Sequence, residues 1–190
     1  PAAGSRTIVN TNTLAISDGS GIATNYTLTN GTLTMTIVPR STTVSGTKTY
    51  DGTTNVASSN LTSFSNLAGS DTLSLSGTGT ISSADVGTGK TVNTSGLTID
   101  NSSGVGSNYT LSAATVNVTE RVIVLSGVRA FDGTNNASSA DLSISNLVSG
   151  ENLTLSGSGT VPNATVEMNK AITLGLSLIH ISEPTRLIGI

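Results

Sequence analysis

The sequence predicts an all-β protein built from tandem immunoglobulin-like β-sandwich repeats of about 80 residues. Apolar residues alternate with Thr in short segments such as Leu33, Met35 and Ile37, which is typical of strands with one buried face. Clusters of Gly, Ser, Asn and Asp separate these segments, as turns do. The same order of motifs then recurs along the chain. A β-solenoid is the alternative, but it needs a repeat of roughly 20 to 30 residues per coil, and none is found.

Three motifs carry the repetition, at spacings of 83, 81 and 80 residues. They are Asn25-Tyr-Thr-Leu28 with Asn108-Tyr-Thr-Leu111, Tyr50-Asp-Gly-Thr-Thr54 with Phe131-Asp-Gly-Thr-Asn135, and the segment 66–80 with 146–160. The agreement over several separate motifs in one order indicates internal duplication.

The repeat boundaries follow from these spacings. Residues 1–38 are predicted to be the C-terminal part of one repeat, 39–119 a complete repeat, and 120–175 the N-terminal part of a third. The composition of residues 176–190 departs from that of the repeats, and this stretch is treated separately below.

The composition excludes several classes of function. Charged residues make up 10% of the chain and the formal net charge is -3, so there is no basic field that would attract nucleic acid. Cysteine is absent, which excludes disulfides, thiolate metal sites and thiol nucleophiles. No apolar run approaches the roughly 20 residues that span a bilayer. We therefore expect no nucleic-acid partner and no membrane span.

The Tyr-Asp-Gly motif is interpreted as a structural turn. The aromatic ring supplies an apolar anchor, the Asp carboxylate bonds the turn backbone, and Gly permits positive φ. The residues concerned are Tyr50, Asp51 and Gly52 in one repeat and Phe131, Asp132 and Gly133 in the next. Calcium binding by Asp51 and Asp132 is the alternative, but Asp51 has no nearby acidic partner in the sequence, and Asp85 and Asp100 would have to approach it in space.

The Asn-Tyr pairs are interpreted as turns at the start of a strand. They are Asn25 with Tyr26 and Asn108 with Tyr109.

No constellation of residues indicates catalysis, and we expect neither an enzyme nor a cofactor. The segment 84–91 resembles a relaxed phosphate-binding loop, with Lys90 and Thr91 at its end. Such a loop must lead into a helix, whereas an alternating strand is predicted to follow, and Gly87-Thr-Gly89 is predicted to be a turn. Serine and threonine are abundant, but a nucleophile needs a base held against it.

Four segments together resemble the YDG-type repeats of filamentous-haemagglutinin-like adhesins, over residues 7–174. They are Tyr50-Asp-Gly-Thr-Thr54, Val86-Gly-Thr-Gly-Lys-Thr-Val92, Gly96-Leu-Thr-Ile99 and Asn108-Tyr-Thr-Leu111. The resemblance implies stalk or spacer repeats of a large bacterial adhesin that is secreted or attached to the outer surface, with neighbouring repeats as partners. The alternative is that each repeat itself binds a glycan or a host protein.

The segment Leu176–Arg186 resembles the translation of an adapter used in preparing sequencing libraries. Residues 176–190 are therefore expected to be non-native, and the sequence to be a metagenomic fragment. His180, the one histidine of the chain, lies in this segment, so no catalytic role is assigned to it.

Overall fold

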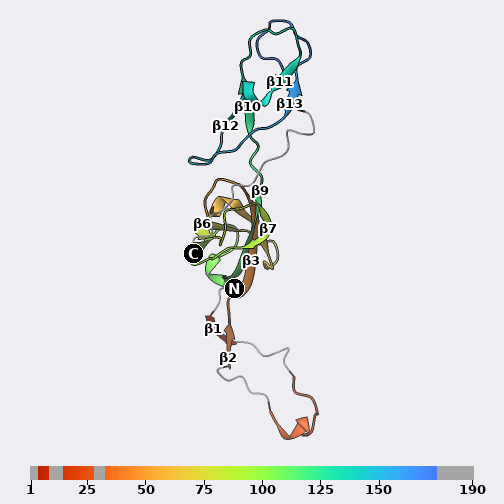
Figure 1. Cartoon of the computed structure of the whole chain (residues 1–190). Coiled ribbons are helices and arrows are strands. Elements are labelled where there is room, and N and C mark those ends of the chain that lie inside the picture. The colour runs from red at the N-terminus through yellow and green to blue at the C-terminus, as the bar shows by residue number, and fades with distance from the viewer. Residues whose placement is uncertain (1–3, 9–14, 28–32, 175–190) are drawn as a thin grey trace. The chain divides into compact units, whose positions relative to one another are not determined.

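The computed structural model in Figure 1 describes residues 4–8, 15–27 and 33–174. Its regular structure consists of β-strands and single 3-10 turns, which confirms the predicted all-β class. The chain divides into two compact units, Pro1–Glu120 and Arg121–Ile190. Each unit is described by itself below. Residues 176–190 lie outside the described residues.

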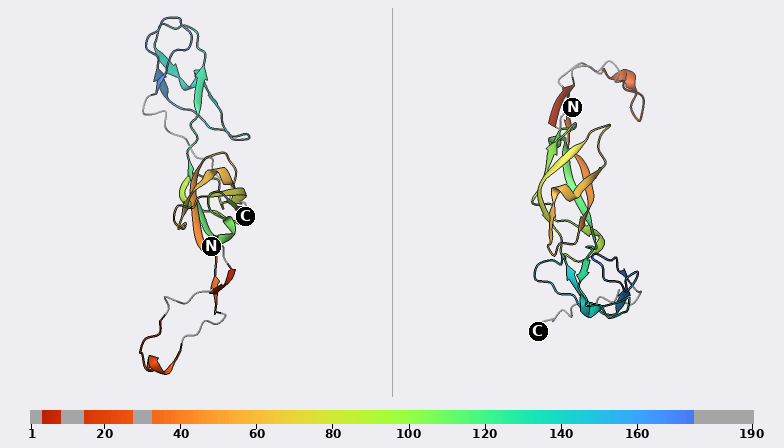
Figure 2. Two further views of the ribbon diagram at one scale, coloured as in Figure 1. Left: turned by 180° about the vertical axis from the view of Figure 1, so that it is seen from behind. Right: turned by 90° about the horizontal axis from the view of Figure 1, so that it is seen from above.

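The complete repeat contains seven strands. They are β3 (Arg40–Thr49), β4 (Asn55–Ala57), β5 (Leu61–Ser65), β6 (Leu73–Thr80), β7 (Gly87–Thr91), β8 (Leu97–Asn101) and β9 (Tyr109–Thr119), with 3-10 turns η2 (Ser58–Asn60) and η3 (Gly106–Asn108). One sheet has the strand order β5-β3-β9-β7 and the other β4-β6-β8. Both can be followed in Figure 2.

The core lies between these two sheets, as in a β-sandwich. Alternate residues of β3 and β9 face inward, because the side-chain period of a strand is two. The buried cluster consists of small and branched side chains, Val44, Val56, Leu61, Ile81, Val92, Ala114, Val116 and Val118, with Tyr50, Phe64, Leu75, Leu97 and Leu111 packed against it. Since members come from strands of both sheets, the core joins them, and the predicted sandwich is found in place of a solenoid.

The first and last strands of the repeat are parallel neighbours. Arg40 is paired with Tyr109 at one end of the ladder, and Thr49 with Thr119 at the other. The chain therefore enters the repeat at one end of the sheet and leaves it at the opposite end. The ten residues of β3 separate these ends by about 33 Å.

A two-stranded antiparallel sheet precedes the complete repeat. It pairs β1 (Gly4–Ile8) with β2 (Leu33–Ile37), and the turn η1 (Ala23–Asn25) lies between them in sequence. Gly4 is paired with Ile37, just as Gly87 of β7 is paired with Val118 of β9. The β1–β2 pair is thus the counterpart of β7–β9 in the preceding repeat, but without the register shift of β7.

The second unit contains counterparts of the opening strands. They are β10 (Val124–Gly127), β11 (Asn136–Ser138), η4 (Ser139–Asp141), β12 (Leu142–Ser145), β13 (Ser158–Thr160) and β14 (Thr173–Leu174). β10 pairs with β12, and β11, β13 and β14 form a second sheet. Asn136 is paired with Thr160 as Asn55 is with Thr80, so the registers of the two repeats agree.

The turn predicted at Gly87-Thr-Gly89 is wrong. These residues belong to β7, whose register against β9 shifts between Gly87 and Lys90. Gly89 has a φ of +62°, and Asn117 Oδ1 accepts a hydrogen bond from its N–H at 2.8 Å. The glycines therefore permit a bulge within the strand, where composition alone predicts a turn. The alternating strand predicted to follow this segment is β8, which begins only at Leu97.

Gly46 allows β3 to pass close to η2. A Cβ atom at this position would lie 1.7 Å from the carbonyl oxygen of Asn60, and one at Gly127 would lie 1.9 Å from the carbonyl oxygen of Asp141.

We predict that Gly46→Ala lowers the free energy of unfolding of the complete repeat by about 3 kcal/mol, since the backbone must move to make room for the added Cβ atom. Ser45→Ala, on the exposed face, is the control and should change it by less than about 0.5 kcal/mol in urea unfolding. Equal effects of the two substitutions would contradict the close approach.

Candidate functional site

The Tyr-Asp-Gly motif forms a tight turn at the end of β3. Gly52 has a φ of +75°, in the left-handed region where glycine is favoured. Asp51 Oδ1 accepts hydrogen bonds from the backbone N–H and the hydroxyl of Thr53, both at 2.9 Å. A carboxylate that bonds the backbone two residues further on defines an Asx turn. The sequence therefore encodes this turn locally, through the side chain of Asp51 and the freedom of Gly52.

Lys48 holds this turn from within the sandwich. Its side chain is 4% exposed, and its ammonium group lies 2.8 Å from Asp51 Oδ1. It donates hydrogen bonds to the carbonyl oxygens of Thr53 at 2.9 Å and Asn55 at 2.6 Å. Since a buried ammonium is stable only when paired and hydrogen-bonded, these three acceptors are what allow Lys48 to lie inside. The lysine thereby ties β3 to the start of β4.

The same arrangement recurs in the second unit with different residues. Asp132 Oδ1 accepts hydrogen bonds from the N–H of Thr134 at 2.8 Å and from its hydroxyl at 2.9 Å, and Gly133 has a φ of +79°. Arg129 takes the place of Lys48, contacting Asp132 and donating to the carbonyl oxygen of Thr134 at 2.7 Å. Two different cations thus stabilise the same turn.

Both aspartates have lowered pKa values. Burial raises the pKa of Asp51, but the hydrogen bonds from Lys48 and Thr53 outweigh it and leave the pKa below the ordinary value. The pKa of Asp132 is lowered first by the backbone hydrogen bond from Thr134 and also by Arg129. Each turn is therefore stabilised by the ionised carboxylate.

A second polar contact lies at the start of β3. Arg40 Nε donates to the carbonyl oxygen of Asn66 at 2.8 Å, and its Nη2 donates to Asn66 Oδ1 at 2.7 Å. Asn66 has a φ of +59° and donates from Nδ2 to the carbonyl oxygen of Ser41 at 2.6 Å. Arg121 and Asn146 repeat the arrangement, with an Nε-to-carbonyl distance of 2.7 Å. Each repeat thus carries an Arg-Asn contact at one end of its first strand and the Asx turn at the other.

The Asn-Tyr pairs lie at the same place in the two repeats. Asn108 ends η3 and Tyr109 begins β9, while Asn25 ends η1. Tyr109 is 7% exposed, donates its hydroxyl proton to Asp71, and accepts a hydrogen bond from the N–H of Ala68 at 3.1 Å. The bond to Asp71 raises the pKa of Tyr109. Tyr26, in contrast, is 69% exposed.

The two aromatic residues of the Tyr-Asp-Gly motifs differ in burial. Tyr50 packs against the core of the complete repeat, whereas Phe131 is 67% exposed. The counterpart of Tyr50 is thus mostly exposed in the second unit.

The described residues contain no group of three or more His, Asp or Glu side chains arranged to hold a metal ion. The Asp51 carboxylate contacts Lys48 and Thr53, and neither Asp85 nor Asp100 belongs to that turn.

Lys90, in the segment that resembles a phosphate-binding loop, donates to the carbonyl oxygen of Ser83 at 3.2 Å. Lys170, the counterpart of Lys90, likewise donates to the carbonyl oxygen of Asn163 at 3.0 Å. A lysine therefore closes this turn in both repeats. No helix in the described part of the chain is long and apolar enough to cross a membrane.

Sequence reasoning did not single out Lys48 and Arg129, which stabilise these turns, and it did not assign a contact to Arg40 or Arg121. The signal was present, because a cation stands three residues before Asp in both repeats, and an arginine stands at the start of β3 and shortly before β10. Lys48 and Arg129 are different residues, so a search for identical motifs misses them. Their shared positive charge becomes visible when the two repeats are aligned and compared by charge.

The seven-stranded sandwich and the Asx turn that recurs at Asp51 and Asp132 together define this chain as a tandem-repeat all-β protein. The YDG domain profile matches residues 32–118 and again residues 116–182. The chain therefore belongs to the YDG domain family. No curated protein matches it, and neither does a solved structure.

Removal of the Lys48 charge tests the buried ammonium. We predict that Lys48→Met lowers the free energy of unfolding by about 3 kcal/mol, because the carbonyl groups of Thr53 and Asn55 and the Asp51 carboxylate lose their common donor. Lys48→Arg should retain most of the stability, since Arg129 holds the same turn. Urea unfolding of both variants checks this, and a Lys48→Met protein as stable as the parent would contradict the assigned role.

The lowered pKa of Asp51 predicts an acid-sensitive turn. A carboxylate whose folded pKa lies below its unfolded value, about 3.9, contributes stability above that value and loses the contribution as pH falls through the folded pKa. We expect the free energy of unfolding to fall between pH 5 and pH 2, in about the range where carboxylates titrate. Asp51→Asn keeps the turn acceptor and removes the titrating group, so its urea midpoint should depend less on pH. An unchanged pH slope would refute the contribution of Asp51.

Proposed function

We propose that the YDG repeats are spacer modules of a large bacterial adhesin, secreted or attached to the outer surface, and that they transmit tension without acting as enzymes. The observation that carries this proposal is the parallel pairing of β3 with β9. It places the two ends of the repeat at opposite ends of the sheet. Under this proposal, each further repeat adds length, which is the property that a spacer in a filamentous-haemagglutinin-like adhesin needs.

The same pairing supports a role under load. Tension applied at Arg40 and Thr119 pulls β3 and β9 in opposite directions along their own axes. All ten paired positions of the ladder then resist together, because the strands must slide and cannot peel. The Arg40 contact to Asn66 and the Lys48 contact to Asp51 brace β3 at its two ends.

A repeat that itself binds a glycan or host protein is the alternative. Aromatic side chains are the usual anchors of such a site. In the complete repeat all three aromatic residues are wholly or partly buried, namely Tyr50, Phe64 and Tyr109. This burial favours a spacer over a binding module.

The mechanical role is tested by pulling the protein in two directions. The chain contains no cysteine, so introduced pairs are its only thiol attachment points. Val38→Cys with Glu120→Cys loads the β3–β9 ladder in shear, whereas Val38→Cys with Ser107→Cys pulls from the same end of both strands and peels them apart. We predict a higher unfolding force for the first pair in single-molecule pulling. Equal forces would contradict the spacer under tension, as would saturable binding of the repeat to glycans on an array.

A further inference from the structure

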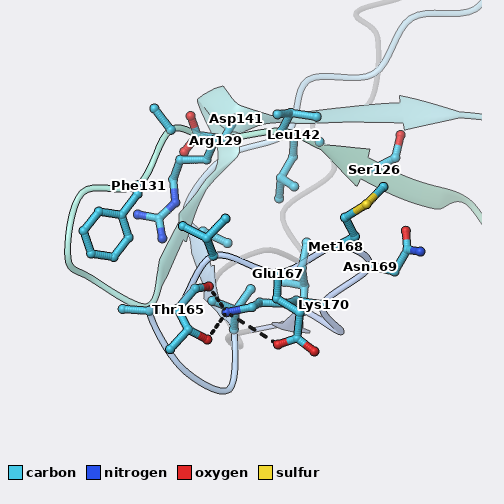
Figure 3. A pocket seen from close by; sticks show the side chains of 18 of the residues that line it. Ser126, Arg129, Phe131, Asp141, Leu142, Thr165, Glu167, Met168, Asn169 and Lys170 are labelled. Atoms are coloured by element: carbon cyan, nitrogen blue, oxygen red, sulfur yellow. Dashed lines mark hydrogen bonds and ion pairs between the residues drawn. The ribbon is translucent and has the colours of Figure 1, made fainter.

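The turn closed by Lys170 in the second unit brings together an amine, a carboxamide and a carboxylate. Lys170 Nζ lies 2.6 Å from Asn163 Oδ1 and 3.9 Å from Glu167 Oε2. The lysine side chain is 12% exposed, and Figure 3 shows its ammonium group directed at the oxygen atoms of Thr165 and Glu167. An amine held against an amide carbonyl, with a carboxylate beside it to carry protons, is the arrangement that amide transfer requires.

The side-chain carbonyl of Asn163 is polarised by two further donors. Its Oδ1 accepts a hydrogen bond from the backbone N–H of Thr165 at 3.1 Å and another from the Thr165 hydroxyl. When an amine adds to Cγ of an amide, negative charge develops on the oxygen, and donors that are already in place stabilise this charge. The Asx turn at Asn163 therefore acts as an oxyanion hole beside the Lys170 amine.

The complete repeat retains the turn but lacks the reacting groups. The backbone carbonyl oxygen of Ser83 accepts from Lys90 as that of Asn163 accepts from Lys170, so closing the turn explains the lysine in both repeats. The side chains at the other three positions differ: Ser83, Asp85 and Gly87 stand where Asn163, Thr165 and Glu167 stand. The carboxamide and the carboxylate are thus additions that the turn itself does not need.

We propose that Lys170 and Asn163 form an intramolecular amide bond, with Glu167 as the proton carrier. Glu167 takes a proton from the Lys170 ammonium group, and the neutral Nζ adds to Cγ of Asn163. The bond from Cγ to Nδ2 then breaks. Nδ2 takes up the two protons that Nζ loses, one of them by way of Glu167, and leaves as ammonium. The new bond joins Nζ to Cγ, and neither an oxidant nor a cofactor takes part.

The bond closes residues 163–170 into a covalent loop. A cross-link stabilises a fold mainly because it restricts the unfolded chain, so the second unit gains a restraint that the complete repeat lacks. The reaction occurs once in each chain and has no turnover. It involves neither load nor ligand and is therefore independent of the spacer role proposed above.

Mass spectrometry of the purified full chain tests the proposal. We expect the intact mass to lie below that of the sequence by the mass of one ammonia molecule. Lys170 is the single lysine or arginine between Arg129 and Arg186, so trypsin should release residues 130–186 as one peptide. Fragmentation of this peptide should place the mass loss between Asn163 and Lys170. A parent chain with the full sequence mass would overturn the proposal.

Three variants separate this bond from other losses of ammonia. Lys170→Arg keeps a cation in the turn but removes the nucleophilic amine, so it should have its full mass. Lys90→Arg, at the counterpart position, is the matched control and should still lose one ammonia. Glu167→Gln should slow the reaction by about 100-fold, because the proton carrier is gone. Loss of ammonia that persists in Lys170→Arg, as from cyclisation of an asparagine on its own backbone, would overturn the bond, and an unchanged rate in Glu167→Gln would overturn the role of Glu167.

Discussion

The parallel ladder between β3 and β9 joins the two ends of the repeat sequence into the centre of one sheet. Each of these strands has a neighbour on both sides, β5 and β7 being the outer ones. Val44, Val116 and Val118 meet the opposite sheet from this central pair. The core therefore exists only once residues about 70 positions apart have come together, and this makes the repeat a cooperative unit.

The second unit shows which pairings nearby sequence can form. Its strands β10 to β13 keep the partners of β3 to β6, and each of these pairs joins segments that lie close together in sequence. Leu125 and Leu142 nevertheless remain half-buried, because no described strand covers them. Antiparallel neighbours can form from nearby sequence, but burial of their apolar face requires the closing strands.

Polar contacts fix the two ends of β3 in a protein that is poor in large apolar side chains. Lys48 and Arg129 both connect the Asx turn to the first strand, and Arg40 and Arg121 both hold an asparagine with positive φ. Aromatic residues make up 3% of the chain, which limits what apolar packing alone can supply. These hydrogen-bonded cations, of which Lys48 is buried, fix the turns where the core is thin.

The sequence by itself determined the local features, because alternation, turn residues and repetition act over short distances. It predicted a strand at Leu33, Met35 and Ile37, and a positive φ at Gly52, from the residues there. Only the tertiary structure decided that β3 and β9 are parallel neighbours and that Lys48 is buried against Asp51. It also turned Gly87-Thr-Gly89 from an expected turn into part of β7. These outcomes depend on which distant strand supplies the hydrogen bonds and the apolar cover, and no local pattern of residues encodes that choice.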